Sequence, residues 1–205
     1  WKVPGVGRVR ANVFKQQGTV GISMRLIPEV VPATEQLGLS PTVLDFAHET
    51  RGLILVTGVT GSGKSTTLAS LIDFINRTRP VHIVTLEDPI EFVHRNVLSV
   101  VTQREIGLDT PNYAGGVRAA LRQDPDVILI GEMRGTATIR AALMAASTGH
   151  LVFSTLHTTD AAETVSRIVS SFPSNHQPTI RQQLASVLRA NISQRLLPRA
   201  DGKGL

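Results

Sequence analysis

The chain contains no cysteine among its 205 residues. Disulfides, thiolate zinc sites and a cysteine nucleophile are therefore excluded, and any bound metal must use oxygen or imidazole ligands. The sequence also lacks an apolar run near the roughly 20 residues that a membrane-spanning helix needs. Its N-terminus lacks the charged-then-apolar pattern of a secretory signal. We therefore expect a cytoplasmic location and no zinc.

Aromatic residues make up only 4% of the chain, although the net charge is +5. The basic excess lies at the two ends, since residues 1–30 and residues 181–205 each hold five basic residues and one acidic residue. The residues between them hold eleven basic and fourteen acidic side chains. Sequence-tolerant nucleic-acid binding combines basic grooves with stacking aromatics. The composition therefore argues against a nucleic-acid partner and suits basic ends that contact other domains or subunits.

The first 30 residues differ in pattern from the rest. Two β-leaning runs, at 8–14 and 19–27, predict the last strands of a truncated N-terminal domain. Frequent prolines and weak hydrophobic periodicity then predict a linker over residues 31–40. Residues 41–205 form the second predicted domain.

From Gly52 onward, compact apolar runs alternate with helical patterns. This alternation predicts an α/β domain, with a mostly parallel sheet covered by helices on both faces. The expected strands are 53–57, 82–86, 97–102, 126–130 and 151–155, and the expected helices are 64–76, 113–122, 137–147, 161–170 and 177–197. Because the chain stops soon after the last long helix, we expect this domain to be truncated at its C-terminal end.

A glycine-rich segment, Gly58–Ser65, reads G-x-x-x-x-G-K-[ST] between an apolar run and a helical pattern. This context predicts a phosphate-binding loop, in which glycines let backbone N–H groups point at phosphate oxygens beside a helix N-terminus. Lys64 is expected to reach the β- and γ-phosphates and Ser65 to ligate Mg²⁺. The predicted nucleotide-binding residues here are Gly58, Thr60, Gly61, Ser62, Gly63, Lys64, Ser65 and Thr66.

Acidic residues follow two of the predicted strands. Glu132 comes after the apolar run 127–130, in the position of a Walker B acid, and Glu87, Asp88 and Glu91 follow the run that ends at Leu86. Carboxyl ends of parallel strands meet at one edge of a sheet, so both groups should lie beside the phosphates. There they can hold the Mg²⁺ shell and orient the attacking water. The pattern leaves open which of the three acids after Leu86 orients the water.

His157 follows the run 151–155 at the same expected edge, where it could sense the γ-phosphate. A lone loop histidine is more often structural. Ser154, His157 and Asp160 are close in sequence, but no G-x-S-x-G elbow accompanies them, so a hydrolytic triad is not supported. A metal site at His150 and His157 lacks a third ligand.

Four ordered motifs give the chain a family resemblance. Gly58–Thr66, Thr85–His94, Leu129–Arg134 and Thr148–Thr158 resemble the Walker A, Asp box, Walker B and His box of secretion-superfamily ATPases. Within that superfamily, Glu87–His94, Gly131–Arg134 and Ile192–Leu197 are most similar to PilT-type pilus retraction ATPases. Val59, where the family often has proline, and Gly135, where it usually has an acid, depart from its pattern.

The resemblance implies a RecA-like P-loop NTPase with the C-terminal strands of a PAS-like N-terminal domain. It implies that Glu91 activates water, that Glu132 supports Mg²⁺ through its water shell, and that His157 couples the nucleotide state to conformation. It further implies phosphate contacts by Arg10 and Arg25. The arginines that match nucleotide or subunit contacts are Arg118, Arg122 and Arg134.

By the same resemblance, the protein is a homohexameric ATPase that uses ATP and Mg²⁺ to drive type IV pilus retraction and twitching motility. Its partner would be an inner-membrane platform protein at the pilus base, where it would be peripheral to the membrane. One alternative is a pilus-extension or type II secretion ATPase, but those relatives commonly carry Cys-x-x-Cys after the equivalent of Gln194–Leu196, and this chain has none. Alternatives of other classes are a DNA-dependent RecA-like translocase and a nucleotide-responsive module without turnover.

Overall fold

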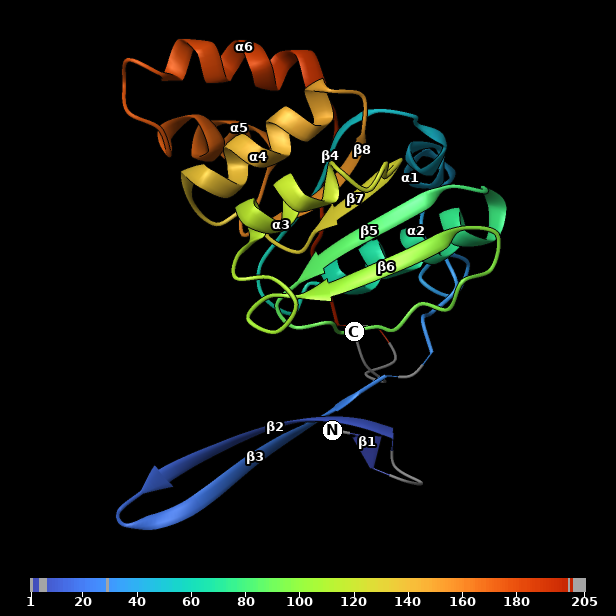
Figure 1. Cartoon of the computed structure of the whole chain (residues 1–205), viewed down its shortest axis with the longest axis vertical. Coiled ribbons are helices and arrows are strands. Elements are labelled where there is room, and N and C mark those ends of the chain that lie inside the picture. Colours follow the sequence, from blue (N-terminus) through green and yellow to red (C-terminus); the bar gives the residue numbers. More distant parts are fainter. Residues whose placement is uncertain (1, 4–6, 29, 199, 201–205) are drawn as a thin grey trace.

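The computed structural model describes residues 2–3, 7–28, 30–198 and 200 (Figure 1). Two sheets are present among them. The smaller is antiparallel, in the order β1-β2-β3, and the larger has six strands in the order β6-β5-β7-β8-β4-β9. The small sheet lies apart from the α/β body, and the chain reaches the body through the segment that follows β3 (Figure 1).

The larger sheet is parallel throughout its pairings. Its middle strands, β4, β7 and β8, are buried along their whole length and read as near-continuous apolar runs, as expected for strands covered on both faces. The strands are β4 (Gly52–Thr57), β5 (His82–Glu87), β6 (Val100–Glu105), β7 (Val127–Ile130), β8 (Leu151–Leu156) and β9 (Leu188–Ser193).

Alternate residues of each buried strand enter two separate cores. On β4, Leu53 and Leu55 belong to one hydrophobic cluster, whereas Ile54 and Val56 belong to the other. The same division holds on β7, where Ile128 and Val127 enter opposite clusters. This follows from the two-residue period of a strand, which sends successive side chains to opposite faces.

Helices cover both faces of this sheet, as predicted. The cluster that contains Ile54 is closed by η1 (Phe46–His48) and α2 (Lys64–Thr78), with side chains of α1 (Pro41–Asp45) packed against it. The opposite cluster is closed by α3 (Tyr113–Ala120), α4 (Gly135–Ser147), α5 (Ala161–Ser170) and α6 (Gln177–Val187).

The small sheet is mainly a long hairpin. Its strands are β1 (Lys2–Val3), β2 (Gly7–Gln16) and β3 (Thr19–Ile27). Gln17 and Gly18 connect β2 to β3 with φ values of 48° and 80°, the pair of positive angles that a two-residue hairpin turn needs. In this register Arg10 lies opposite Arg25, so the two side chains share one face of the hairpin.

The predicted helix over 177–197 is wrong beyond Val187. From Leu188 the chain forms β9, which pairs in parallel with the otherwise open edge of β4, with a register shift at Leu53 and Ile54. Pairing satisfies the backbone groups of that edge, and Ala190 and Ile192 pack against the core on the α2 side. Tertiary pairing therefore overrides local helical pattern here.

Smaller differences concern the ends of elements. The strand expected over 97–102 is observed at 100–105, because the backbone of residues 97–99 is bonded to Asn76 instead of to β5. The helix expected to reach Arg122 ends at Ala120, and α4 begins at Gly135, two residues earlier than predicted.

Candidate active site

Four neighbouring strands of the large sheet deliver the predicted site residues to one edge. The acidic segment follows β5, Gly131 and Glu132 follow β7, His157 follows β8, and the glycine-rich loop follows β4. Together with the hairpin arginines they line one cavity of about 720 Å³. Parallel strands place their carboxyl ends together, which is the physical basis of this convergence.

The glycine-rich loop connects β4 to α2, as predicted. Gly61 and Gly63 have φ values of 81° and 88°, and a Cβ at either position would meet nothing within 4 Å, so the space above the loop is open. Gly58 is different, because a Cβ there would lie 2.3 Å from the backbone oxygen of Gln194. This glycine allows the end of β9 to pack closely against the loop.

Lys64, the first residue of α2, is buried beneath the loop. Its Nζ donates hydrogen bonds to the carbonyl oxygens of Gly58 and Val59, each at 2.9 Å. Burial lowers the pKa of Lys64, and the negative charges of Glu132 and Glu91 oppose this shift. An ammonium group held by neutral carbonyls beside two carboxylates is suited to binding phosphate oxygens when they arrive.

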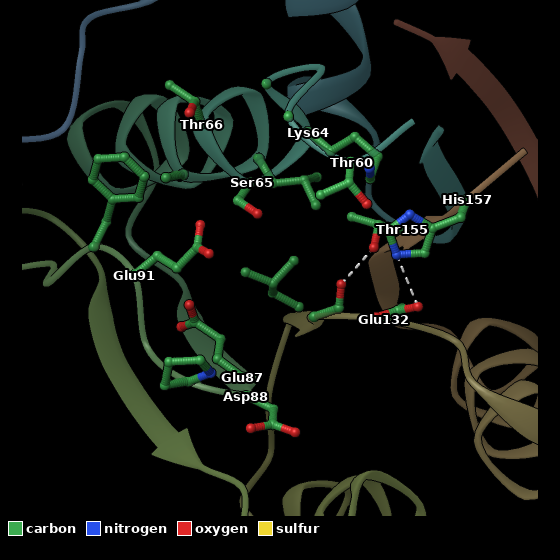
Figure 2. Close-up of a pocket in the computed structure, with 18 of the residues that line it drawn as sticks. Thr60, Lys64, Ser65, Thr66, Glu87, Asp88, Glu91, Glu132, Thr155 and His157 are labelled. Atoms are coloured by element: carbon green, nitrogen blue, oxygen red, sulfur yellow. Dashed lines mark hydrogen bonds and ion pairs between the residues drawn. The ribbon is translucent and has the colours of Figure 1, made fainter. Parts of the chain in front are cut away.

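The remaining loop residues divide by position. Thr60, Ser65 and Thr66 line the cavity beside Lys64 (Figure 2). Ser62 is only 2% exposed, and its Oγ is buried without a hydrogen-bond partner. Gly58 and Ser62 therefore shape the loop, whereas the other predicted positions face the open space.

The three acids at and after the end of β5 lie in different environments. Glu87 accepts hydrogen bonds from Thr85 Oγ1 at 2.6 Å and Gln103 Nε2 at 3.1 Å, and burial raises the pKa of its carboxyl group. Asp88 and Glu91 are more exposed and line the cavity. Of the labelled acids of this segment, Glu91 lies nearest Ser65 and Thr66 in the close-up (Figure 2). The geometry therefore favours Glu91 as the acid that faces a bound phosphate.

Glu132 connects two further cavity residues. Its Oε1 pairs with Arg134 Nε at 2.8 Å and with His157 Nε2 at 3.1 Å. Figure 2 shows Glu132 and His157 together on the opposite side of the cavity from Glu91. The predicted Walker B acid and the predicted histidine are thus paired at the ends of β7 and β8.

The predicted arginines do not all reach the cavity. Arg10 and Arg25 line it from the hairpin, and Arg134 lines it from the end of β7. Arg118 on α3 and Arg122 just after α3 are exposed and are not among the cavity-lining residues. Their predicted role in nucleotide or subunit contacts remains a prediction.

Three residues in or behind the cavity were missed from the sequence. Tyr113 lines the cavity at the start of α3, and burial and the nearby charge of Asp88 raise its pKa to about 12. Thr155 Oγ1 donates to the Gly131 carbonyl at 2.7 Å, which fixes the Walker B turn. Gln103 on β6 holds Glu87. A hydroxyl at the end of an apolar run was a usable signal for Thr155, whereas nothing local marked Tyr113 or Gln103.

The cavity suits a nucleoside triphosphate with Mg²⁺. It offers open space above an N–H-rich loop, a buried lysine and a serine hydroxyl at one wall, and carboxylates at another. In the part of the chain that the structure describes, no cluster of three or more His, Cys, Asp or Glu side chains could hold a metal. Ser65 and Glu132 line the cavity, and a hydroxyl and a carboxylate are oxygen donors of the kind that Mg²⁺ takes together with phosphate oxygens.

No helix within the described residues is long and apolar enough to cross a membrane.

Comparison with known proteins gives concordant matches. The family described as "Type II/IV secretion system protein" matches residues 14–203. The chain is 50% identical over 202 residues to the type IV pilus retraction ATPase PilT of Pseudomonas aeruginosa, which covers 98% of this chain and 59% of the relative. It is 50% identical over 204 residues to a twitching motility protein of Neisseria gonorrhoeae, with 100% and 54% covered. The chain thus spans little more than half the length of these relatives.

A solved structure agrees with the sequence matches. The crystal structure of the pilus retraction motor PilT with bound ADP superimposes with a TM-score of 0.96 and 55% identity. The match covers 100% of this chain and 59% of that chain. This likeness extends from the small sheet to the end of the described α/β body.

Proposed function

The chain belongs to the type II/IV secretion system protein family, and from this membership we propose that it is the catalytic part of an ATP-hydrolysing motor that retracts type IV pili. One observation supports the hydrolytic part most directly. Lys64, Glu91 and Glu132 share a single cavity with two arginines from the separate hairpin. Such a cavity can bind, cleave and respond to a nucleotide.

The residues of the cavity divide the work of phosphoryl transfer to water. Lys64 exchanges the Gly58 and Val59 carbonyl oxygens for phosphate oxygens and stabilises their charge. Glu91 orients the attacking water and accepts its proton. Mg²⁺, when bound, supplies charge neutralisation at the phosphates, with Ser65 as ligand and Glu132 at its water shell.

The group of Glu132, Arg134 and His157 gives hydrolysis a route to conformational change. Glu132 Oε1 has two cationic or titratable partners at the same oxygen. A change in charge near Glu132 therefore changes how strongly its carboxylate binds Arg134 relative to His157. In this proposal His157 reports the nucleotide state to the helices beyond β8.

The hairpin arginines complete the site from outside the α/β body. Replacing both Arg10 and Arg25 with alanine is expected to weaken Mg²⁺–ATP binding about 10- to 100-fold, because two charge-assisted phosphate contacts are lost. Isothermal titration calorimetry measures the change. Lys15→Ala is the matched control, since Lys15 lies on the opposite face of the same hairpin. Equal nucleotide affinity of the double variant and the control would show that the hairpin arginines do not contribute to nucleotide binding.

The relatives support the proposed motor function. The named relatives act in pilus retraction and twitching motility. We propose a homohexamer on the cytoplasmic side of the inner membrane at the pilus base, acting on a platform protein. Arg118 and Arg122, exposed on and after α3, are proposed to contact a neighbouring subunit or its nucleotide. The predicted division at residues 30 and 40 would then separate two bodies that move relative to one another.

The experiment that tests hydrolysis is a steady-state assay of phosphate release with and without Mg²⁺. We expect turnover that stops when EDTA removes the metal and that does not rise on addition of DNA. Stimulation by DNA would favour a RecA-like translocase, and nucleotide binding without turnover would favour a binding module. A pilus-extension or type II secretion ATPase would share this activity, so motility assays have to separate that alternative.

A further inference from the structure

The segment between β5 and β6 carries Glu91 but has no regular secondary structure over residues 88–99. Its path therefore depends on bonds made to other parts of the molecule. Two side chains of β6, Gln103 and Glu105, supply several of them. They are two residues apart on one strand and so point to the same face of it.

Gln103 bonds the backbone of the Glu91 segment on both sides of Val93. Its Oε1 accepts from the backbone N–H of His94 at 2.8 Å, and its Nε2 donates to the Phe92 carbonyl oxygen at 2.9 Å. The side-chain amide thus offers a donor and an acceptor at once, as a peptide group of a neighbouring strand would. This arrangement fixes the backbone one residue after Glu91.

The same amide also reaches the acid that precedes Glu91. Gln103 Nε2 lies 3.1 Å from Glu87 Oε1, and the backbone N–H of Glu91 donates to the Glu87 carboxylate. Glu105 Oε2 accepts from the N–H of Ile90 at 3.1 Å. Bonds from β6 therefore fix the segment immediately before Glu91 as well as after it.

The support itself is rigid. β6 pairs with β5 along its whole length, Phe92 is only 7% exposed, and Asn76 of α2 fixes the far end of the segment through the Arg95 carbonyl oxygen at 2.7 Å. Glu91 is thus an exposed residue whose neighbours in the segment are held on both sides. Its carboxylate is presented to the cavity by these bonds.

We propose that Gln103 is a positioning residue for ATP hydrolysis, which holds the Glu91 carboxylate in place for the attacking water, with Glu105 supporting the preceding residue. The inference rests on the proposed role of Glu91 in hydrolysis. Neither Gln103 nor Glu105 lines the cavity, so both act through Glu91 and touch no substrate.

Gln103→Met removes all three bonds at nearly constant volume. We expect kcat of the intact protein to fall about 10- to 100-fold, because a displacement of the order of 1 Å in a reacting group costs that much. KM for ATP should change less than about twofold, since the loop and Lys64 are untouched. Thr102→Val is the matched control: Thr102 is half-buried on the other face of β6 and bonds His82, so its loss should lower stability but leave kcat unchanged.

Glu105 provides an independent pair of variants. Glu105→Gln keeps an oxygen that can accept from Ile90 and should retain most turnover, whereas Glu105→Leu has none and should lose turnover in the manner of Gln103→Met. This rescue by the conservative variant distinguishes a hydrogen-bonding role from a general need for a folded β6, even if Gln103→Met folds poorly.

Combining Gln103→Met with Glu91→Gln gives the decisive comparison. If Gln103 acts through Glu91, the double variant should be no slower than Glu91→Gln alone. Additive losses, or kcat of Gln103→Met equal to that of Thr102→Val in a protein that hydrolyses ATP, would overturn the inference and leave the proposed function intact. Absence of hydrolysis in the wild type would overturn both.

Discussion

Lys64→Ala should lower kcat/KM for ATP hydrolysis about 100- to 1000-fold, because a preorganised cation directed at the transferring phosphoryl group is lost. The structure explains why no neighbour can substitute. Among the residues that the structure describes, Lys64 is the only lysine that lines the cavity, and its Nζ is held by two loop carbonyls. Phosphate release under saturating Mg²⁺–ATP and nucleotide affinity by calorimetry should both fall.

Arg77→Ala is the matched control for this variant. Arg77 lies at the other end of α2, where it pairs with Asp73 on the surface at 2.6 Å. Its loss should change stability little, as for exposed ion pairs generally, and should leave hydrolysis unaltered. Wild-type turnover in Lys64→Ala would show that the glycine-rich loop is not the nucleotide site.

Glu91→Gln should reduce kcat about 100- to 10,000-fold, the usual contribution of a positioned general base. The amide keeps the shape of the side chain but cannot accept the proton of the attacking water. Mg²⁺–ATP binding should persist, because the lysine, the serine and the arginines remain. We expect the variant to accumulate with unhydrolysed nucleotide bound, which single-turnover kinetics can detect.

Asp88→Asn separates Glu91 from its neighbour. Both acids line the cavity, but of the two only Glu91 acts on the pKa of Lys64, and it lies nearer Ser65 and Thr66 in the close-up (Figure 2). Asp88→Asn should therefore retain hydrolysis within about tenfold of the wild type. If Asp88→Asn instead loses turnover and Glu91→Gln keeps it, the base has been assigned to the wrong residue.

The sequence was most informative where local chemistry and topology agree. The glycine-rich loop was recognisable because its residue types are needed for one backbone shape, and its place between a buried strand and a helix was correct. Glu91, Glu132 and His157 were placed at one sheet edge from the strand pattern alone, and the structure brings them to one cavity. Parallel-sheet geometry made this possible, because strands that are distant in the sequence place their carboxyl ends at the same edge of the sheet.

What was missed depends on contacts between distant segments. Leu188–Ser193 has a sequence compatible with a continuing helix, and only the open edge of β4 makes it a strand. Gln103 looks like an ordinary polar residue of an edge strand until the path of residues 88–96 is known. The Glu132–His157 bond likewise needs the neighbouring placement of β7 and β8.

The measurement that tests the central claim most directly is pilus retraction in cells that lack the protein, complemented with either wild type or Glu91→Gln at equal expression. Because retraction is proposed to require hydrolysis at this cavity, the wild type should restore twitching, and Glu91→Gln should leave extended pili that do not retract. Normal retraction in uncomplemented cells, or full restoration by Glu91→Gln, would contradict the account.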